Sequence, residues 1–509
     1  MASDQSELVQ GSELTVADTM GGRMHVRWDE RAAATPHGQL VFFAEFLATA
    51  GIFDRWVDAC PLSYSSPNAS SKRDVLGTLM LGILAGSRRY AHIAGVRGDT
   101  VAAQALGLRG IVSEDSVRRA LKAIAPEAGE SWMRSALMHS VRAALERPWV
   151  LDMDVTIKPL YGHQEGAEVG YNPHKPGRPS HALHTFWVGN LRLVLDAALS
   201  AGKQHSAKYA KAPLERLLDE LADQRPQLVR GDCGFGNEDI IAICERRGLP
   251  YLLRLRQTAN VKRLIERLFR REDWTRATAA SQGWQALEDS IKLSGWSCAR
   301  RVVVLRRRIQ HDLALTNRQH EKQRVLALAH DDVQDAAQVW EYTVLVTNAP
   351  YELGAIGQLY RDRCDSENGF DELKNQWGWG GFTTQDLHRS QLSARAVALV
   401  YNWWSWYVRA ANPGARREAL TSRPLLLAAV GRATSHAGQT LLHLTPMHAE
   451  TGLIKSMIAN VQAAIRHVRL AAEQLPKLDR WRALLAYICH KIVSHNPLPT
   501  PPPALSAPA

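Results

Sequence analysis

Strand-like and helix-like patterns alternate from residue 148 to about residue 256, and this alternation constrains the fold more than any other feature. The segment PWVLDMDVTI places Val150, Asp152, Asp154 and Thr156 on one face of a strand and apolar side chains on the other. A pair of strands is predicted in HTFWVGN and RLVLDAALSAG, followed by helix, strand, helix and strand in KYAKAPLERLLDELADQ, PQLVRGD, NEDIIAICERRG and LPYLLRL. This order is typical of an α/β domain.

Helical patterns lie on both sides of the α/β segment. Residues 35–147 predict an N-terminal helical domain, in which Ser113 can cap the helix SEDSVRRALKAI. Helix, turn and helix with basic residues could bind DNA, but an ordinary helical bundle fits equally well. Residues 413–495 predict a C-terminal helical region. The ends are expected to be a polar leader over residues 1–34 and a disordered Pro-rich tail over residues 496–509.

Nearly all the excess positive charge falls in one internal segment. Residues 254–324 hold 17 basic and 7 acidic residues, a net of +10 out of the chain's +11. A helix in ANVKRLIERLFRR and strand signals in ARRVVVLRRRI and VLALAH predict a basic, partly β insertion over residues 257–340. The α/β core is then expected to resume over residues 341–412, beginning with the strand EYTVLVTN. Such a positive segment favours a polyanionic partner.

Composition argues against several classes of protein. The six cysteines are scattered without a CxxC pair, which disfavours a disulfide framework and a structural zinc site. No window holds the roughly 18 apolar residues needed to cross a bilayer, and the polar start lacks the apolar core of a signal peptide. No membrane partner is expected, and the protein is expected in the cytoplasm.

Three carboxylates occupy positions suited to a divalent cation. Asp154 lies near the end of the first strand, with Asp152 on the same face, and Asp232 ends the strand PQLVRGD. Glu367 lies in YRDRCDSENGFDELKNQW, a predicted helix beside the sheet. Hard cations prefer oxygen ligands, and two such ions can drive phosphodiester displacement. A lone aspartate at a strand end is more often a turn or cap residue, and the choice between Asp152 and Asp154 stays open.

The residues Tyr360, Arg363 and Lys374 complete the pattern Tyr-x2-Arg-x3-Glu-x6-Lys around Glu367. On one continuous helix the four positions fall within about 60° of one face. Two cations and a tyrosine around one glutamate would suit a metal ligand beside a phosphate backbone. For the helix taken alone, a solvated charged face is the alternative.

Together these segments resemble the DDE transposases of bacterial insertion sequences, in the branch with the Tyr-Arg-Glu-Lys signature. The signature matches at all four positions, LDMDVT resembles the first-aspartate motif with Asp154 and Thr156, and VRGDCGF resembles the second-aspartate motif. The loop YGHQEGAEVGYNPHKPGRPSH resembles the one that follows the first aspartate in a subgroup of these enzymes. The resemblance spans about residues 35–490.

The resemblance implies an α/β fold with an RNase H-like catalytic core and a mostly β insertion, flanked by N-terminal and C-terminal helical regions. It implies that Asp154, Asp232 and Glu367 are both catalytic residues and metal ligands, with two Mg2+ ions per site and Mn2+ as a substitute. The expected reaction is cleavage of DNA at the terminal inverted repeats and transfer of the ends into target DNA. A homodimer would engage double-stranded DNA in a synaptic complex at the bacterial nucleoid.

Three kinds of side chain are expected to contact DNA. The signature residues would hold phosphates near the scissile end. Two cations in the loop after the first aspartate would line the DNA path, and one insertion tryptophan is a candidate for stacking on a flipped base, with a core or surface position as the alternative. In that order, the residues are Tyr360, Arg363 and Lys374, then Lys175 and Arg178, then Trp296.

Two further groups, and two rival functions, complete the predictions. Four histidines in the same loop lack a cysteine partner, which disfavours a zinc site, and the aromatic cluster in NWWSWY is spaced for core packing rather than for base stacking. The rivals to the transposase are a domesticated DNA-binding protein that no longer cleaves and a structure-specific nuclease on the same fold. The intact set of three carboxylates argues against the first rival.

Overall fold

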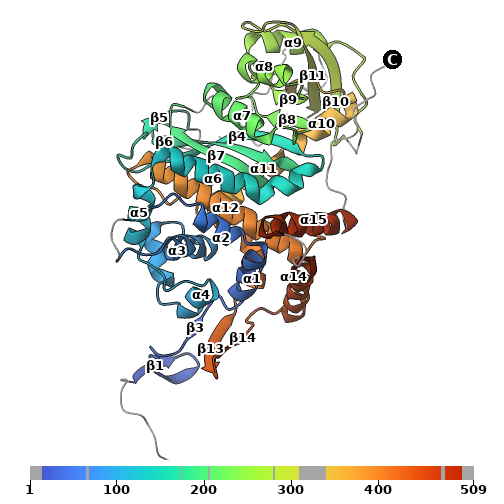
Figure 1. The fold of residues 1–509 in the computed structure, drawn as a ribbon. Helices are drawn as coiled ribbons and strands as arrows, with labels where there is room; N and C mark the ends of the chain where they lie inside the picture. Colours follow the sequence, from blue (N-terminus) through green and yellow to red (C-terminus); the bar gives the residue numbers. More distant parts are fainter. Residues whose placement is uncertain are drawn as a thin grey trace, which may run out of the picture.

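Nine strands within the described residues form one mixed sheet that runs through the upper half of the molecule (Figure 1). The computed structural model describes residues 14–64, 68–172, 175–204, 207–278, 281–308, 340–471 and 476–495. The nine strands are β4 (Val150–Pro159), β5 (Glu168–Val169), β6 (Pro179–Val188), β7 (Leu193–Ala201), β8 (Leu228–Gly231), β9 (Tyr251–Arg254), β10 (Trp284–Ile291), β11 (Arg300–Arg308) and β12 (Trp340–Thr347).

The order of the strands places the start of β4 at the centre of the sheet. The order is β10-β11-β12-β9-β8-β4-β6, and β5 and β7 both pair with β6. The pairs β4–β8 and β8–β9 are parallel, and the other pairs are antiparallel. Strands β10 and β11, from the predicted insertion, continue the central sheet through β12. An α/β architecture with helical flanks is therefore confirmed.

Helix α12 (Leu387–Ala411) lies between this sheet and helices from both ends of the chain (Figure 1). It packs on β7 and α6 (Pro126–Val141), and it also contacts α3 (Lys72–Leu84) and α14 (Thr451–Ala471). The other helices are α1 (Leu40–Ala50), α2 (Ile52–Asp58), α4 (Thr100–Ala105), α5 (Glu114–Ala123), α7 (Ala207–Leu221), α8 (Glu238–Arg246), α9 (Ala259–Phe269), α10 (Leu353–Arg361), α11 (Cys364–Gln376), α13 (Ala419–Leu426) and α15 (Lys477–His495).

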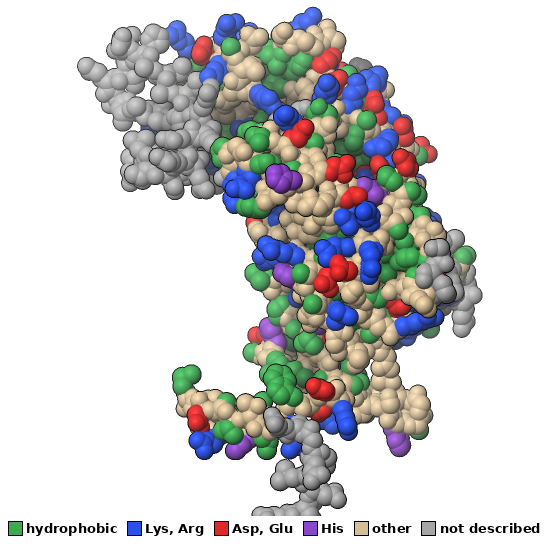
Figure 2. Space-filling model, turned by 90° about the vertical axis from the view of Figure 1, so that its left-hand side faces the viewer, with side chains coloured by type: hydrophobic (Ala, Val, Ile, Leu, Met, Phe, Trp, Pro, Cys, Tyr) green, Lys and Arg blue, Asp and Glu red, His purple; other side chains and the backbone are tan. Residues whose placement is uncertain are grey.

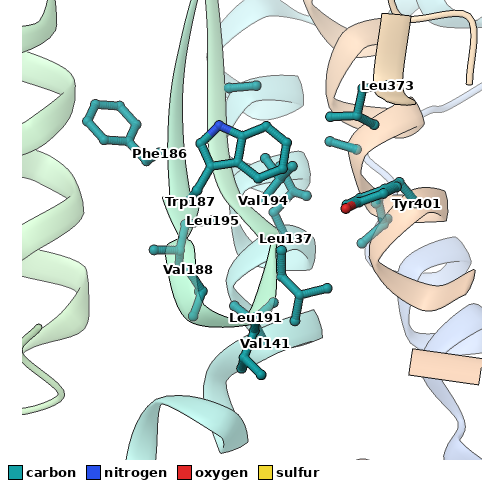
Figure 3. Packing of buried hydrophobic residues seen from close by; sticks show 14 of the residues in the cluster. Leu137, Val141, Phe186, Trp187, Val188, Leu191, Val194, Leu195, Leu373 and Tyr401 are labelled. Carbon is teal, nitrogen blue, oxygen red and sulfur yellow. The ribbon is translucent and has the colours of Figure 1, made fainter. Parts of the chain in front are cut away.

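The core joins the sheet to α6, α11 and α12. Figure 3 shows Trp187 of β6 and Val194 of β7 on the side of Tyr401 and Leu373, which come from α12 and α11. The ring of Trp187 meets that of Phe370 edge-on at 5.2 Å. The predicted core role of the aromatic cluster in α12 is confirmed, because its four side chains are fully buried; they are Trp403, Trp404, Trp406 and Tyr407.

Two hairpins correct the sequence predictions at the ends of the chain. Within the expected polar leader, β1 (Thr15–Thr19) pairs with β2 (Gly22–Val26). Within the expected C-terminal helical region, β13 (Val430–His436) pairs with β14 (Gln439–Thr445), and β13 also pairs with β3 (Ala34–Thr35). Ala437 and Gly438, which join β13 to β14, both have positive φ, as a two-residue hairpin turn requires. The apolar run before this turn gave the helical prediction, although apolar runs also suit strands.

Two other predictions concern residues that the structure does not describe. The expected Pro-rich tail and the strand signal in VLALAH lie outside the described residues. Within the described ranges, the helices are all too short or too polar to cross a bilayer.

Candidate active site

Strand register brings two of the three predicted carboxylates together. Parallel pairing of β4 with β8 matches Asp152 with Arg230 and Met153 with Gly231. Asp154 is the next residue along β4, and Asp232 is the next residue after β8. The two side chains therefore emerge side by side, on the face of the sheet that carries Asp152. Both line one cavity of about 270 Å³. Its other lining residues are Cys233, Arg254, Trp284, Leu305, Glu341, Thr343, Tyr360, Arg361 and Arg363.

Asp154 is nearly buried, and Arg363 forms an ion pair with it. Arg363 Nη2 donates to Asp154 Oδ2 at 2.6 Å, and the Val155 amide donates to Oδ1 at 2.8 Å. Burial alone would lower the pKa of Arg363, but the negative charge of Asp154, with contributions from Tyr360 and Asp232, raises it. Arg363 therefore stays charged beside the first carboxylate.

Asp232 opens the tight turn that follows β8. Its Oδ1 accepts the Gly234 amide at 2.8 Å, and its carbonyl oxygen accepts the Phe235 amide at 3.0 Å. A side chain at Gly236 would meet the carbonyl oxygen of Arg254 at 2.3 Å, so the turn needs glycine there to lie against β9. The glycine-rich sequence thus directs Asp232 toward the cavity.

Asp152 belongs to a structural ion pair beneath this cavity. Arg230 Nε and Nη2 donate to its two carboxylate oxygens at 2.6 and 2.7 Å. Asp152 is 0% exposed and Arg230 4% exposed. Both oxygens are thus engaged by one guanidinium, which makes Asp154 the carboxylate of β4 that faces the cavity.

The predicted signature helix is two helices, which corrects the single-helix prediction. Tyr360 lies in α10, Lys374 in α11, and Arg363 in the junction, where its amide donates to the carbonyl oxygen of Tyr360 at 3.1 Å. This hydrogen bond joins residues three apart, as in a 3-10 helix, so the chain makes one tighter turn between α10 and α11. Tyr360 and Arg363 still reach the same cavity. Glu367 belongs to α11, but its side chain is outside the described part of the structure.

Burial shifts both remaining signature residues away from their ordinary pKa. Desolvation raises the pKa of Tyr360 to about 12, so its hydroxyl keeps its proton at neutral pH. Desolvation also lowers the pKa of half-buried Lys374, against the attraction of Asp154 and Asp371. Lys374 therefore lies within electrostatic reach of the first carboxylate.

The two described carboxylates of the cavity fit a hard divalent cation in donor type. Carboxylate oxygens are the ligands that Mg2+ prefers. Among the side chains that the structure describes, no group of three His, Cys, Asp or Glu forms a metal site. Asp154 and Asp232 therefore supply two donors, and a third would have to come from outside that set. His181 and His184, which the structure places in β6, each donate from Nε2 to a backbone carbonyl oxygen, at 2.8 and 2.7 Å.

The predicted DNA contacts outside the signature are not among the residues that line the cavity. Lys175 and Arg178 are exposed and lie over the ring of Tyr161, at 5.0 and 4.6 Å from its centre. Trp296 is 7% exposed and packs against the guanidinium of Arg300 at 5.1 Å. Lys and Arg side chains are spread over the upper and middle parts of the face in Figure 2.

Seven of the eleven lining residues were not named by the sequence predictions, among them Trp284 and Arg254. Trp284 begins β10, and Arg254 ends β9. The alternation in LPYLLRL could have placed Arg254 on the face of Asp232, since Arg254 ends β9 and Asp232 directly follows β8. Trp284 had no such signal, because β10 was not predicted and its pairing with β11 is a tertiary feature.

A comparison with models of protein families finds a match over most of the chain. The family model described as transposase DDE domain group 1 matches residues 23–466. A cryo-EM structure of a piggyBac transposase synaptic complex with hairpin DNA is similar at 10% identity, covering 93% of this chain and 87% of that chain. Its TM-score is 0.32, a likeness too slight to bear on function. A comparison with curated proteins gave no match.

Proposed function

The chain belongs to the transposase DDE domain group 1 family, and from this membership we propose that it cleaves DNA at terminal inverted repeats and transfers the ends into target DNA. The observation that carries the proposal is the meeting of Asp154 and Asp232 in one cavity with Tyr360 and Arg363. Carboxylates gathered beside cations suit a phosphodiester whose charge must be held while a bond to phosphorus breaks.

Asp154, Asp232 and Glu367 would hold two divalent ions, Mg2+ or Mn2+. Such ions activate a water or a 3′-hydroxyl and stabilise the leaving oxygen. Tyr360, with its hydroxyl protonated, would donate a hydrogen bond to a phosphate oxygen. Lys374, from the last turn of α11, would add a charge-assisted contact.

The full proposal includes the setting of the reaction. The catalytic core would be RNase H-like, and the chain would belong to the branch with the Tyr-Arg-Glu-Lys signature. It would originate from a bacterial insertion sequence and act as a homodimer on double-stranded DNA at the nucleoid. Lys175 and Arg178 would contact the DNA backbone. Trp284 and Trp296 are both nearly buried, at 9% and 7% exposed, but only Trp284 lines the cavity, so Trp284 would be the nearer of the two to an unpaired base.

The experiment is an end-cleavage assay with purified protein, Mg2+ and a duplex carrying the inverted repeats that flank the reading frame. Nicks at the repeat ends followed by joining to a second duplex are expected. Binding without nicking would identify the domesticated DNA-binding protein instead. Nicking without joining would identify the structure-specific nuclease.

Glu367→Gln should abolish nicking and leave repeat binding intact. Loss of a metal ligand removes several kcal/mol of transition-state stabilisation, so the rate should fall on the order of 10³-fold or more. Repeat affinity, measured by gel shift without divalent metal, should change by less than about twofold, because no cationic side chain is removed. Glu341→Gln is the matched control, since Glu341 lines the same cavity but pairs with Arg307 at 2.7 Å. Cleavage by the Glu367 variant, or its loss in the control, would contradict the assignment.

A further inference from the structure

The carboxylate of Asp154 already has a cation bound to it. Its Oδ2 accepts from Arg363 at 2.6 Å, and the side chains of Asp154 and Arg363 are only 12% and 6% exposed. Water therefore screens the pair poorly. A divalent ion that approached Asp154 would meet both an occupied oxygen and a positive guanidinium, so the ion and Arg363 compete for one carboxylate.

A second arginine of the cavity has no such commitment. Gly231 pairs with Leu253, so the next residues along β8 and β9 are Asp232 and Arg254. Arg254 lines the cavity, and no carboxylate among the described residues lies within ion-pair distance of it. Arg254 can therefore meet an incoming phosphate at once, whereas Arg363 can offer its Nη2 to a phosphate only by leaving Asp154.

We propose that Arg363 acts as a removable counter-charge: it occupies Asp154 in the DNA-free protein and transfers to a DNA phosphate, which frees Asp154 for the divalent ion. The inference rests on the proposed function and gives Arg363 a positioning role beyond phosphate contact. A guanidinium binds phosphate oxygens as well as carboxylate oxygens, through the same paired N–H geometry. Arg363 therefore has an anionic hydrogen-bond partner both before and after the exchange.

Reciprocal coupling between metal and DNA follows from this exchange. If bound DNA removes the competing cation, it raises the affinity of the protein for the metal, and the metal must raise the affinity for DNA by the same factor. The metal site would then be completed chiefly on DNA, which limits hydrolysis elsewhere. Arg254 would supply the first phosphate contact, because its guanidinium needs no release.

The test is a Mn2+ titration followed by electron paramagnetic resonance of the free ion, with and without a duplex that ends at the repeat terminus. Asp154→Asn gives the background from other sites and from DNA. A neighbouring charge shifts the affinity of a carboxylate for its proton by about one to three pKa units. Arg363→Gln should accordingly raise DNA-free Mn2+ affinity by about tenfold or more. DNA should tighten Mn2+ binding in the wild type and much less in this variant.

Arg254→Gln is the matched control, because it removes the same charge from the same cavity without breaking an ion pair. Its DNA-free Mn2+ affinity should rise by less than about threefold, while its DNA affinity falls. An equal gain in both variants, or none in Arg363→Gln, would overturn the proposal. Arg363→Lys, which keeps the charge but not the paired geometry, should show a smaller gain and serves if the Gln variant does not fold. A DNA duplex that binds without tightening Mn2+ would overturn the release step, whereas a duplex that does not bind would overturn the proposed function.

Discussion

The two halves of strand β4 hold the same kind of side chain in opposite settings. Around Asp152, β4 is flanked by β6 on one side and β8 on the other. The carboxylate of Asp152 forms a buried ion pair with Arg230 through two hydrogen bonds. Two residues further, β8 has ended at Gly231, and Asp154 faces a cavity instead of a neighbouring strand. The same alternation therefore gives an enclosed ion pair where the sheet is continuous and an ion pair that borders a cavity where a strand stops.

The difference shows that the end of β8, rather than the identity of the residue, decides which aspartate reaches the cavity. A buried pair with both oxygens engaged cannot take up a metal without losing its partner. Asp154 accepts a hydrogen bond from Arg363, and the adjoining cavity leaves space into which the Arg363 side chain can move. Substitutions along β4 can test this contrast.

The largest effect on stability is expected from Asp152→Ala. The change leaves Arg230 buried without its carboxylate, which should lower the free energy of unfolding by about 3–5 kcal/mol in urea denaturation. Asp154→Ala should cost less, because Arg363 lines the cavity and can turn into it once its partner is gone. The double variant Asp152→Leu with Arg230→Met should recover most of the loss, since an apolar pair of similar volume needs no ionic partner. Equal costs for the two single variants would remove the distinction between the halves.

The sequence could predict the strand but not the choice between its two aspartates. Alternation in PWVLDMDVTI put both on one face, and motif order put Asp232 at a strand end, as observed. The selection depends on where β8 stops relative to β4, which is a pairing between residues nearly 80 positions apart. The break between α10 and α11, and the position of Trp284 on β10, likewise depend on tertiary packing that a local pattern does not encode.

A smaller effect is expected from Lys158→Met, further along the same face of β4. Lys158 is buried, donates to the Gly381 carbonyl oxygen at 2.6 Å, and has no ion pair with any described carboxylate. Burial lowers its pKa from 10.5 to about 8. At pH 7 the lysine is charged in both folded and unfolded chains, so the burial cost is fully present, and the Met variant should be more stable by about 2 kcal/mol after loss of the hydrogen bond.

The pH dependence gives the sign of this effect. Between pH 8 and 10.5 the folded protein has lost a proton that the unfolded chain still binds. The wild type should therefore gain stability relative to Lys158→Met as pH rises through this window, and the advantage of the variant should shrink. Urea denaturation of both proteins at pH 7 and pH 10 measures the change. A constant difference would show that Lys158 titrates normally and that this end of β4 is open to water.

The smallest effect is expected from the cationic side chains of the loop after β4. These side chains are exposed, and within the described structure they form no ion pair with a carboxylate. Lys175→Ala and Arg178→Ala should each weaken binding to the repeat duplex by a few-fold and reduce the slope of log affinity against log salt by about one. Lys211→Ala is the matched control, because exposed Lys211 pairs with Asp239 at 3.3 Å on the surface. Fluorescence anisotropy over a range of salt concentrations separates these outcomes. An unchanged slope in the loop variants would confine DNA contact to the cavity end of β4, whereas a reduced slope would extend the path of the DNA from Asp154 along the whole second half of the strand.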